Sequence, residues 1–534
     1  MILNKNILNF NIANTLKRLP KITDSCFWLS VIITFISLNI IFIYHSSHFL
    51  FGDHDWKYLK EGVPINSGLF EARFTQFIPI NLLSNGEILP ILNNIFGILG
   101  FSLGISLLAK YWQIPNTKKS YIIFCLFTAI SPFILSFMYF AFIIIPCLGW
   151  NFIIISSLLI SQKETNFSLK YTLASSLLVC FALGGYPPVI NFFAVALSTR
   201  LLIATIYEKS GIKNLYINYR YSIINFILGI IIYKLFTIYL TNTGAINSNY
   251  YNLQTTPINQ WATKFLFISK DIIKQFFVTL PFIGLEYKIP VLIITIISIL
   301  YTLTLIYSKK TSPLALLFLI SIFYAGMITL FLSTSIKETE FSPRIDFFGL
   351  LYIYSAMLTI ILKSKSNFIK NIAQLLVIIS ISSSLVSLFE AQKVWHLGYK
   401  TEMNLYKRII KRHETSPNFH LYKNRYKIIQ AGSPSFRNKY YHSTYSHPSD
   451  DLLNISFVPG LNSGIMWNYF AQYEYASTTS YVYEFIPDPT FIEFIKNANV
   501  WPSENSTYVG YYWIATILSK ASLDALKINY SIHP

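Results

Sequence analysis

The sequence predicts an all-α polytopic membrane protein, with about eleven transmembrane helices and a small α/β extracytoplasmic domain at its C-terminal end. Of its 534 residues, 53% are hydrophobic and only 12% are charged, and the mean hydropathy is +0.47. A soluble chain of this length carries roughly a quarter charged residues. Apolar runs of about 20 residues, the length that crosses a bilayer, recur up to residue 390. The region after residue 390 is polar but rich in aromatic residues, as a folded domain is.

Apolar runs place the spans in order along the chain. The predicted spans are 27–45, 88–109, 121–138, 141–162, 171–185, 189–207, 221–240, 288–307, 313–332, 345–362 and 371–390. Proline and glycine interrupt the third to sixth spans at SPF (131–133), IPCLG (145–149) and GGYPP (184–188). These positions predict kinks or re-entrant breaks, which persist at membrane depth only where protein or a water-filled cavity covers the backbone. GGYPP is interpreted as a helix break, with a role in lining a cavity as the alternative.

The distribution of basic residues predicts the orientation. With the N-terminus inside, 17 Lys and Arg residues fall in inner segments and 9 in outer loops before residue 391. Short cytoplasmic loops carry this excess in membrane proteins, so the N-terminus is predicted to be cytoplasmic. The same bias accounts for the net charge of +18 without nucleic acid as a partner. The first apolar run is too long for a cleavable signal and is interpreted as the first span.

Two domains follow from this organisation. Residues 1–390 form the predicted membrane domain, with a long outer loop at 46–87 and a second at 241–287, whose amphipathic stretches suit the membrane interface. Residues 391–534 form the predicted outer domain, in which a basic amphipathic helix is expected at 403–413 and strands at 425–433 and 480–487.

The first outer loop gathers residues that can do chemistry. GDHDW (52–56) holds Asp53 and Asp55, and FEARFTQF (70–77) holds Glu71 and Arg73. A carboxylate held near a sugar hydroxyl can act as its general base, and a second carboxylate can orient the acceptor or bind a cation. The alternative for the two Asp is a solvated helix exit. Arg73 can bind a lipid phosphate, or it can pair within the chain or reach the interface.

A second charged group precedes the tenth span, in KETEFSPRIDFFG (337–349). Lys337, Glu340 and Arg344 lie at the outer start of this span. An Arg at this depth costs free energy unless it meets an anion, and the phosphate of a lipid is one that its planar guanidinium binds through two hydrogen bonds. Pairing of Arg344 with Asp346 or Asp55, or snorkelling to the interface, is the alternative.

No other motif indicates a cofactor. His45, His48 and His54 lie near the two Asp, but their spacing matches no standard metal site, and a wet interfacial cluster is the simpler interpretation. The chain has no phosphate-binding loop of the G-x-x-x-x-G-K-[ST] type and no G-x-S-x-G elbow. We therefore expect no cofactor; a divalent cation is compatible with the acidic loop but nothing in the sequence requires it.

GDHDW, FEARFTQF and SPRIDFFG, in this order and with this topology, resemble the type II family of serotype-converting O-antigen glucosyltransferases (type II Gtr), within the GT-C class of polytopic membrane glycosyltransferases. The family's acidic motif is two adjacent Asp, and Gly precedes its Arg. Here His54 separates the acids and Ala72 precedes Arg73. Which of Asp53 and Asp55 is the counterpart is therefore open.

The resemblance implies a function. It implies transfer of a hexose such as glucose, with inversion, from a polyprenyl-phosphate donor to a surface glycan such as the O-antigen of lipopolysaccharide, at the periplasmic face of a bacterial inner membrane. Asp53 or Asp55 would be the base, and Arg73 and Arg344 would hold the departing phosphate, with Lys337, Glu71 and Glu340 beside them. The alternatives are a lipid-linked glycan polymerase or ligase, a transporter or flippase of lipid-linked sugar, and a structural assembly partner. The sugar, the linkage, the acceptor and the oligomeric state are not specified by the sequence.

Overall fold

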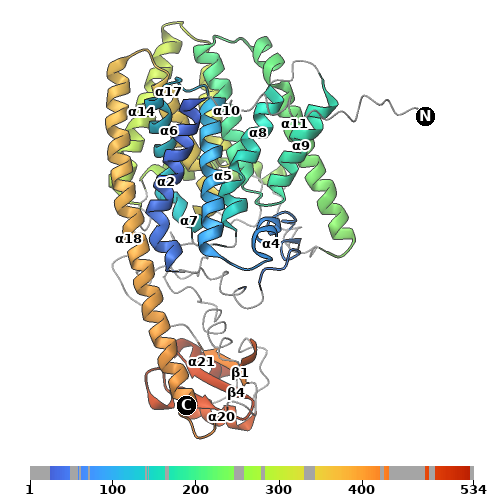
Figure 1. Cartoon of the computed structure of the whole chain (residues 1–534), viewed down its shortest axis with the longest axis vertical. Coiled ribbons are helices and arrows are strands. Elements are labelled where there is room, and N and C mark those ends of the chain that lie inside the picture. The colour runs from blue at the N-terminus through green and yellow to red at the C-terminus, as the bar shows by residue number, and fades with distance from the viewer. Residues whose placement is uncertain are drawn as a thin grey trace, which may run out of the picture.

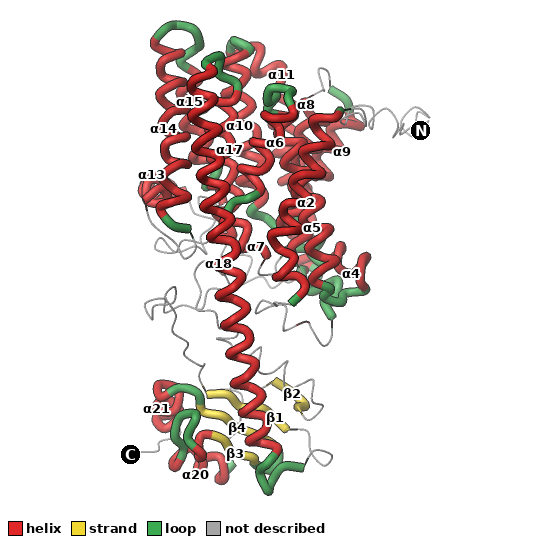
Figure 2. The backbone as a smooth tube through the Cα atoms, turned by 60° about the vertical axis from the view of Figure 1, so that its left-hand side comes forward, coloured by secondary structure: helices red, strands yellow, loops and turns green. Residues whose placement is uncertain are grey.

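The computed structural model describes residues 24–48, 58, 62–69, 72–138, 141, 143–162, 167–245, 258–277, 283–329, 343–420, 426–431, 476–479 and 488–529. These residues form a helical bundle joined by one long helix to a small sheet domain (Figures 1 and 2). The long helices of the bundle are α2 (Ser25–Ser47), α5 (Pro90–Tyr111), α6 (Lys118–Ala129), α8 (Asn151–Gln162), α9 (Leu169–Leu183), α10 (Val189–Tyr207), α11 (Ile212–Asn242), α14 (Leu285–Tyr307), α15 (Leu314–Ala325), α17 (Pro343–Leu362) and α18 (Asn367–Glu414). The short ones are α4 (Ile78–Ser84), η3 (Pro132–Ile134), α7 (Leu135–Met138), η4 (Ile145–Gly149) and η5 (Ile258–Gln260). The amphipathic α13 (Trp261–Phe277) follows η5 directly and precedes α14.

Several helices are able to cross a membrane, as the sequence predicts. Among the described residues, seven are long and apolar enough: α2, α5, η4 with α8, α10, α11, α14 and the Asn367–Lys393 part of α18. Shorter apolar helices are α9, α15 and the Gly349–Leu362 part of α17. The predicted span 121–138 is divided between α6 and the short η3 and α7. The chain is therefore a multi-pass membrane protein, and the number eleven stays a prediction.

The three predicted interruptions are confirmed. α6 ends at Ala129 and a separate turn, η3, begins at Pro132. IPCLG forms η4, a single π-helical turn before α8. GGYPP separates α9 from α10. Proline removes a backbone donor and clashes with the preceding helical turn, so its effect is local and can be read from sequence.

Helix α5 packs closely against η4 and α8 through glycines. A Cβ at Gly100 would lie 2.5 Å from the carbonyl oxygen of Gly149, and one at Gly104 would lie 2.8 Å from the backbone nitrogen of Phe152. Small residues at such spacing let two helix backbones approach each other, which is how helices associate where lipid gives no hydrophobic drive. This contact fixes the broken segment 145–149 against a continuous helix.

The two ends of the bundle can be identified from the contacts between its helices. The hydroxyl of Tyr207, at the end of α10, donates to the carbonyl of Ile360, near the end of α17, at 2.5 Å. The starts of α10 and α17 therefore share the opposite end. Helix α18 begins just after α17 and runs the other way, and its Gln392 donates to Ile41, near the end of α2, at 3.0 Å. The 184–188 break, the start of α17, the end of α2 and the sheet domain thus lie toward one end, which we call the loop end; the opposite one is the far end (Figure 1).

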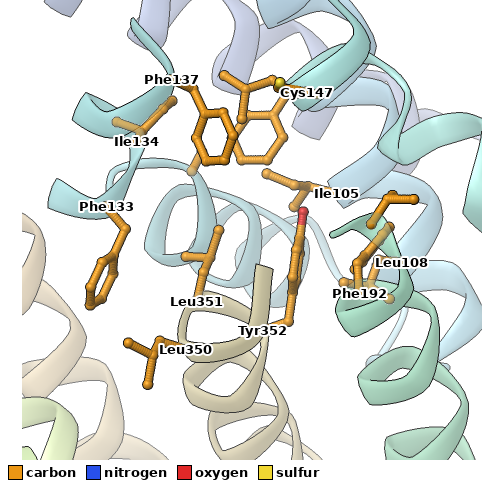
Figure 3. Close-up of a cluster of buried hydrophobic side chains, with 14 of the residues drawn as sticks. Ile105, Leu108, Phe133, Ile134, Phe137, Cys147, Phe192, Leu350, Leu351 and Tyr352 are labelled. Atoms are coloured by element: carbon orange, nitrogen blue, oxygen red, sulfur yellow. The ribbon is translucent and has the colours of Figure 1, made fainter. Parts of the chain in front are cut away.

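A continuous apolar core fills the bundle between these ends. Phe133, Ile134 and Phe137 of the broken segment join side chains of α5, α10 and α17 in it (Figure 3). The rings of Phe192 and Tyr352 lie 4.1 Å apart at their centroids. The segments on either side of the breaks are therefore held by packing.

The sheet domain has its own core. Its four strands, β1 (Tyr426–Ala431), β2 (Ala476–Thr479), β3 (Thr507–Val509) and β4 (Trp513–Ile517), are ordered β2-β1-β4-β3. β1 is parallel to both of its neighbours, and β3 and β4 form an antiparallel hairpin. Helices α20 (Pro489–Asn497) and α21 (Lys520–Asn529), with the turn η8 (Glu504–Ser506), are the other elements of the domain among the described residues. The predicted strand at 425–433 is confirmed, and the one at 480–487 lies outside the described residues.

Helix α18 joins the two parts without interruption. The predicted helix at 403–413 is its last part, and the predicted domain boundary at 390/391 falls inside it. Arg412 anchors this helix to the domain: it donates to the carbonyl of Ser503 at 2.8 Å and lies 4.2 Å from the ring centroid of Trp501. His413 and the hydroxyl of Thr516 lie 2.9 Å apart.

Candidate functional site

Of the predicted site residues, the structure describes Arg73 and Arg344. Asp53, Asp55, Glu71, Lys337 and Glu340 lie outside the described residues, so their predicted roles stay predictions. Arg344 lies in the first turn of α17, at the loop end. Arg73 lies in the described part of the first loop, and the candidate site is built around it.

Residues 72–77 form a run of tight turns that leads into α4. Ala72 has a left-handed backbone, with φ of 58°, and is 1% exposed. The amide of Arg73 donates to the carbonyl of Gly68 at 2.8 Å. The hydroxyl of Tyr233, on α11, lies 3.4 Å from the carbonyl of Ala72. The backbone that carries Arg73 is therefore held from both sides.

This loop segment covers the 184–188 break. The amide of Thr75 donates to the carbonyl of Gly184 at 2.9 Å, and its hydroxyl donates to the carbonyl of Phe181 at 2.7 Å. Both carbonyls belong to the end of α9, where the helix no longer supplies donors. An interrupted backbone at membrane depth requires such a cover. The break and the Arg73 segment thus form one structural unit.

The guanidinium of Arg73 lies 5.9 Å from the ring centroid of Tyr186, within the range of a cation–π contact. Tyr186 belongs to GGYPP and is 5% exposed. Its ring meets that of Phe137, on α7, edge to face at 5.9 Å. The cavity-lining role of GGYPP stays the alternative interpretation, and its tyrosine lies beside Arg73.

The break at 145–149 belongs to the same structural unit. Trp150 directly follows η4, and its ring lies 4.6 Å from that of Phe181. A Cβ at Gly185 would overlap the ring of Trp150, so the close approach of these segments requires glycine there. Segments beside all three predicted breaks therefore meet near Arg73.

A second group of charges at the loop end was not predicted as part of the site. Lys264 and Asp271 on α13 are 5% and 8% exposed, and Lys288 on α14 is 3% exposed. Large apolar residues on α13 face outward instead, among them Leu266 at 70% and Ile273 at 63% exposed. The helix therefore presents apolar side chains to its surroundings and two ionisable ones to the protein. The spacing of seven residues between Lys264 and Asp271 is the sequence signal for a shared face.

Aromatic contacts connect this second group to the breaks. Phe276, near the end of α13, lies 5.6 Å from the ring of Tyr354 on α17. Phe133, in η3, lies within 6.4 Å of the rings of both Tyr354 and Tyr287. Buried charges in a protein are paired or bind ions. The loop end therefore holds buried charges on α13 and α14 beside the helix breaks.

The histidines near the predicted acidic motif do not gather into a metal site in the described part of the chain. His45 is 1% exposed, whereas the ring of His48 lies 3.9 Å from that of Tyr44 and 5.2 Å from that of His396. Among the residues that the structure describes, no group of three or more His, Cys, Asp or Glu could hold a metal ion. Comparison of the chain with known protein families, with curated proteins and with solved structures gives no match.

Proposed function

We propose that this chain is a membrane glycosyltransferase of the GT-C type. It moves a hexose, such as glucose, from a polyprenyl-phosphate donor to O-antigen or another surface glycan at the outer face of a bacterial inner membrane. The seven bilayer-length helices support the lipid part of this proposal. The eleven-span topology and the periplasmic position of the sheet domain belong to the same proposal.

In this mechanism Asp53 or Asp55 takes the proton from an acceptor hydroxyl. The hydroxyl oxygen attacks the anomeric carbon, the bond from that carbon to the phosphate oxygen breaks, and the configuration inverts. The electron pair leaves with the lipid phosphate, whose developing charge is offset by Arg73 and Arg344. Positive groups placed where charge develops give the largest stabilisation of many transition states.

One observation carries the proposal: Arg73 is held over Tyr186 at the point where three helix breaks meet. A bundle of continuous helices would be simpler and more stable, because broken helices leave backbone groups to be satisfied. At membrane depth such breaks persist only where protein or a water-filled cavity covers the backbone, and here they gather beside a cation of the predicted outer loop. The first turn of α17, with Arg344, lies at the same end, which suits two cations acting on one phosphate.

The test is transfer in vesicles by Asp53→Asn and Asp55→Asn, singly and together. We expect one single variant to lose about 100-fold or more of its transfer rate, since a general base contributes about 10²- to 10⁴-fold. Glu87→Gln is the matched control, because Glu87 is an exposed carboxylate of the same outer loop. Full transfer by both single variants and by the double variant, at equal membrane levels, contradicts the base assignment.

Transport of lipid-linked sugar is a second candidate, favoured by the buried ionisable side chains. Lys264, Asp271 and Lys288 near the loop end, and Arg200 within α10, are all at most 8% exposed. Ionisable residues at membrane depth often line transport pathways. Movement of a fluorescent lipid-linked sugar across vesicles that contain the chain, undiminished in the Asp53 and Asp55 variants, would favour transport over transfer.

A further inference from the structure

A group of polar and charged side chains lies at the far end of the bundle, away from Arg73. We call it the Arg200 cluster, and its members come from α5, α10 and α11 and from the turn after α17: Tyr111, Gln113, Arg200, Glu208, Tyr219 and Lys363. Arg200 lies inside a predicted span and is 2% exposed. An Arg within the membrane costs free energy, so it is paired with an acidic side chain or a carbonyl, and it often marks a functional site.

Among the described residues, the anionic partner of Arg200 is Glu208. The Nη2 atom of Arg200 lies 2.6 Å from Oε1 of Glu208. The side chain of Gln113 completes the contact when its oxygen accepts from Arg200 Nη2 at 2.7 Å and its nitrogen donates to Glu208 at 2.9 Å. The guanidinium also lies 5.6 Å from the ring centroid of Tyr219. An aromatic ring in this position holds the plane of the guanidinium.

The cluster has more hydrogen-bond donors than its own acceptors satisfy. In the described part of the chain, Nε and Nη1 of Arg200 and the hydroxyl of Tyr111 are buried without a hydrogen-bond partner. Lys363 Nζ donates to the main-chain carbonyl of Gln113 at 2.5 Å. An ammonium has three N–H groups, so this bond leaves others. Buried donors in a native protein are almost always satisfied, which indicates that something accepts from these.

The charges of the cluster also indicate that it binds an acceptor, and that this acceptor is an anion. It holds two cations, Arg200 and Lys363, and one carboxylate, Glu208. Burial and the charge of Arg200 lower the pKa of Lys363, while Glu208 opposes this shift. A second negative charge would relieve both cations. Arg and Lys together, with hydroxyl donors nearby, are the groups that bind a phosphate.

Glu208 is placed so that an anion can replace it as the partner of Arg200. It is the C-cap of α10, and its side chain is 34% exposed, whereas that of Arg200 is 3% exposed. The C-terminus of a helix disfavours a negative charge, so Arg200 rather than the helix holds this carboxylate. An anion from outside can approach along Gln113, Glu208 and Lys363, the three members of the cluster that are not buried.

We propose that the Arg200 cluster is a binding site for a phosphate-bearing anion, and that the Glu208 carboxylate is its internal competitor. The guanidinium of Arg200 and the ammonium of Lys363 bind the phosphate oxygens when Glu208 turns outward. The ligand is either free phosphate or the phosphate of a lipid headgroup in the adjacent leaflet. The site lies at the opposite end from Arg73 and does not depend on the proposed glycosyl transfer.

The test measures binding to the full chain in nanodiscs, in two arms. Titration with inorganic phosphate in neutral phosphatidylcholine, followed by calorimetry, tests the free ion. Retention of phosphatidylglycerol in native mass spectrometry tests the lipid. We expect Glu208→Gln to tighten binding by at least about tenfold in one arm, because it removes the competing charge. Lys363→Gln is expected to weaken binding in the same arm.

Two matched controls belong to this test. Lys213→Gln removes an exposed cation near the same end, and Glu414→Gln removes an exposed carboxylate of the sheet domain; both should bind as the unmodified chain does. If Glu208→Gln tightens the binding of phosphate alone, or of the lipid alone, the result supports the site and identifies the source of the phosphate group that it binds. Two results overturn the proposed site. In the first, Glu208→Gln tightens binding in neither arm. In the second, the control variants change binding as much as Lys363→Gln does.

Discussion

At the scale of single residues, the site depends on Gly185 as much as on its charged side chains. A Cβ at this position would overlap the ring of Trp150, which cannot move without disturbing Phe181. We expect Gly185→Ala to destabilise the bundle by about 1–3 kcal/mol, the usual cost of overpacking. The measurement is thermal unfolding of the full chain in nanodiscs.

Gly211→Ala is the control for this change, since a Cβ at Gly211 would meet nothing within 4 Å. Its unfolding temperature should stay near that of the unmodified chain. Gly185→Ala combined with Trp150→Ala should lose less stability than the two changes added, because they relieve one overlap. Equal stability of the two glycine variants would show that the breaks do not pack as described.

His413 gives the sheet domain a dependence on pH. Burial, with a smaller contribution from Arg412, lowers the pKa of His413 to about 3. An unfolded His titrates near pH 6.5. Between these values the unfolded state binds a proton that the folded state does not, so the free energy of unfolding falls as the pH is lowered from about 6.5 toward 3. At neutral pH this contribution to stability is fully present.

We expect His413→Gln to weaken this pH dependence, because its amide can meet Thr516 but does not titrate. Hydrogen exchange of β4, corrected for the intrinsic effect of pH and compared at pH 7 and 4.5, measures the change. His420→Gln, which replaces an exposed histidine nearby, should leave the dependence as it is. The prediction is wrong if His413→Gln and the unmodified chain lose protection equally on acidification.

Sequence alone identifies some of these residues and misses others for a physical reason. Arg73 was selected because it lies in a predicted outer loop, in a motif that resembles that of a known family, and its role stays a prediction. Arg200, Lys264 and Asp271 could not be selected from sequence, because their significance depends on which face of a helix is buried. Periodicity gives the spacing of a face but not what covers it.

At the scale of elements, breaks could be predicted better than the extent of a helix. The interruptions at 131–133, 145–149 and 184–188 follow from local proline and glycine chemistry. Helix α18 was expected to end with its apolar run at 390, yet it continues to Glu414. Residues 391–414 contain no proline, so nothing in their backbone ends the helix once it has begun.

The continuity of α18 is testable with one proline. Lys400 is exposed and lies between the apolar part of this helix and its anchor at Arg412. We expect Lys400→Pro to cost about 3 kcal/mol locally and to open the helix there, since proline removes a hydrogen bond and clashes with the preceding turn. Limited proteolysis of the full chain should then cut between residues 393 and 412.

Lys400→Ala is the matched control, because it removes the same side chain and leaves the helix intact. Its cleavage pattern should match that of the unmodified chain once the loss of one lysine site is allowed for. Identical patterns for the proline and alanine variants would mean that the two parts of the chain are not joined by a rigid helix.

At the scale of the whole molecule, the separate core of the sheet domain depends on pairings that sequence does not reveal. β1 pairs with β4 from Lys427↔Trp513 to Ala431↔Ile517, across more than 80 residues of chain. Short strands carry little periodicity, and their partners are fixed only when α20, α21 and the end of α18 pack around them. The class of the domain was therefore predictable, but its strand order was not.

The arrangement of the bundle predicts which exposed positions share a side of the membrane. Lys310, between α14 and α15, belongs to the far end, whereas Tyr511, in the β3–β4 hairpin, belongs to the sheet domain beyond the loop end. The excess of Lys and Arg in the predicted inner segments predicts that the far end is cytoplasmic. In a chain whose four cysteines are replaced by serine, we therefore expect Tyr511→Cys to react with an impermeant thiol reagent in intact spheroplasts. Lys310→Cys should react only after permeabilisation. The reverse pattern would contradict the orientation alone, whereas labelling of both positions from one side would contradict the course of the helices themselves.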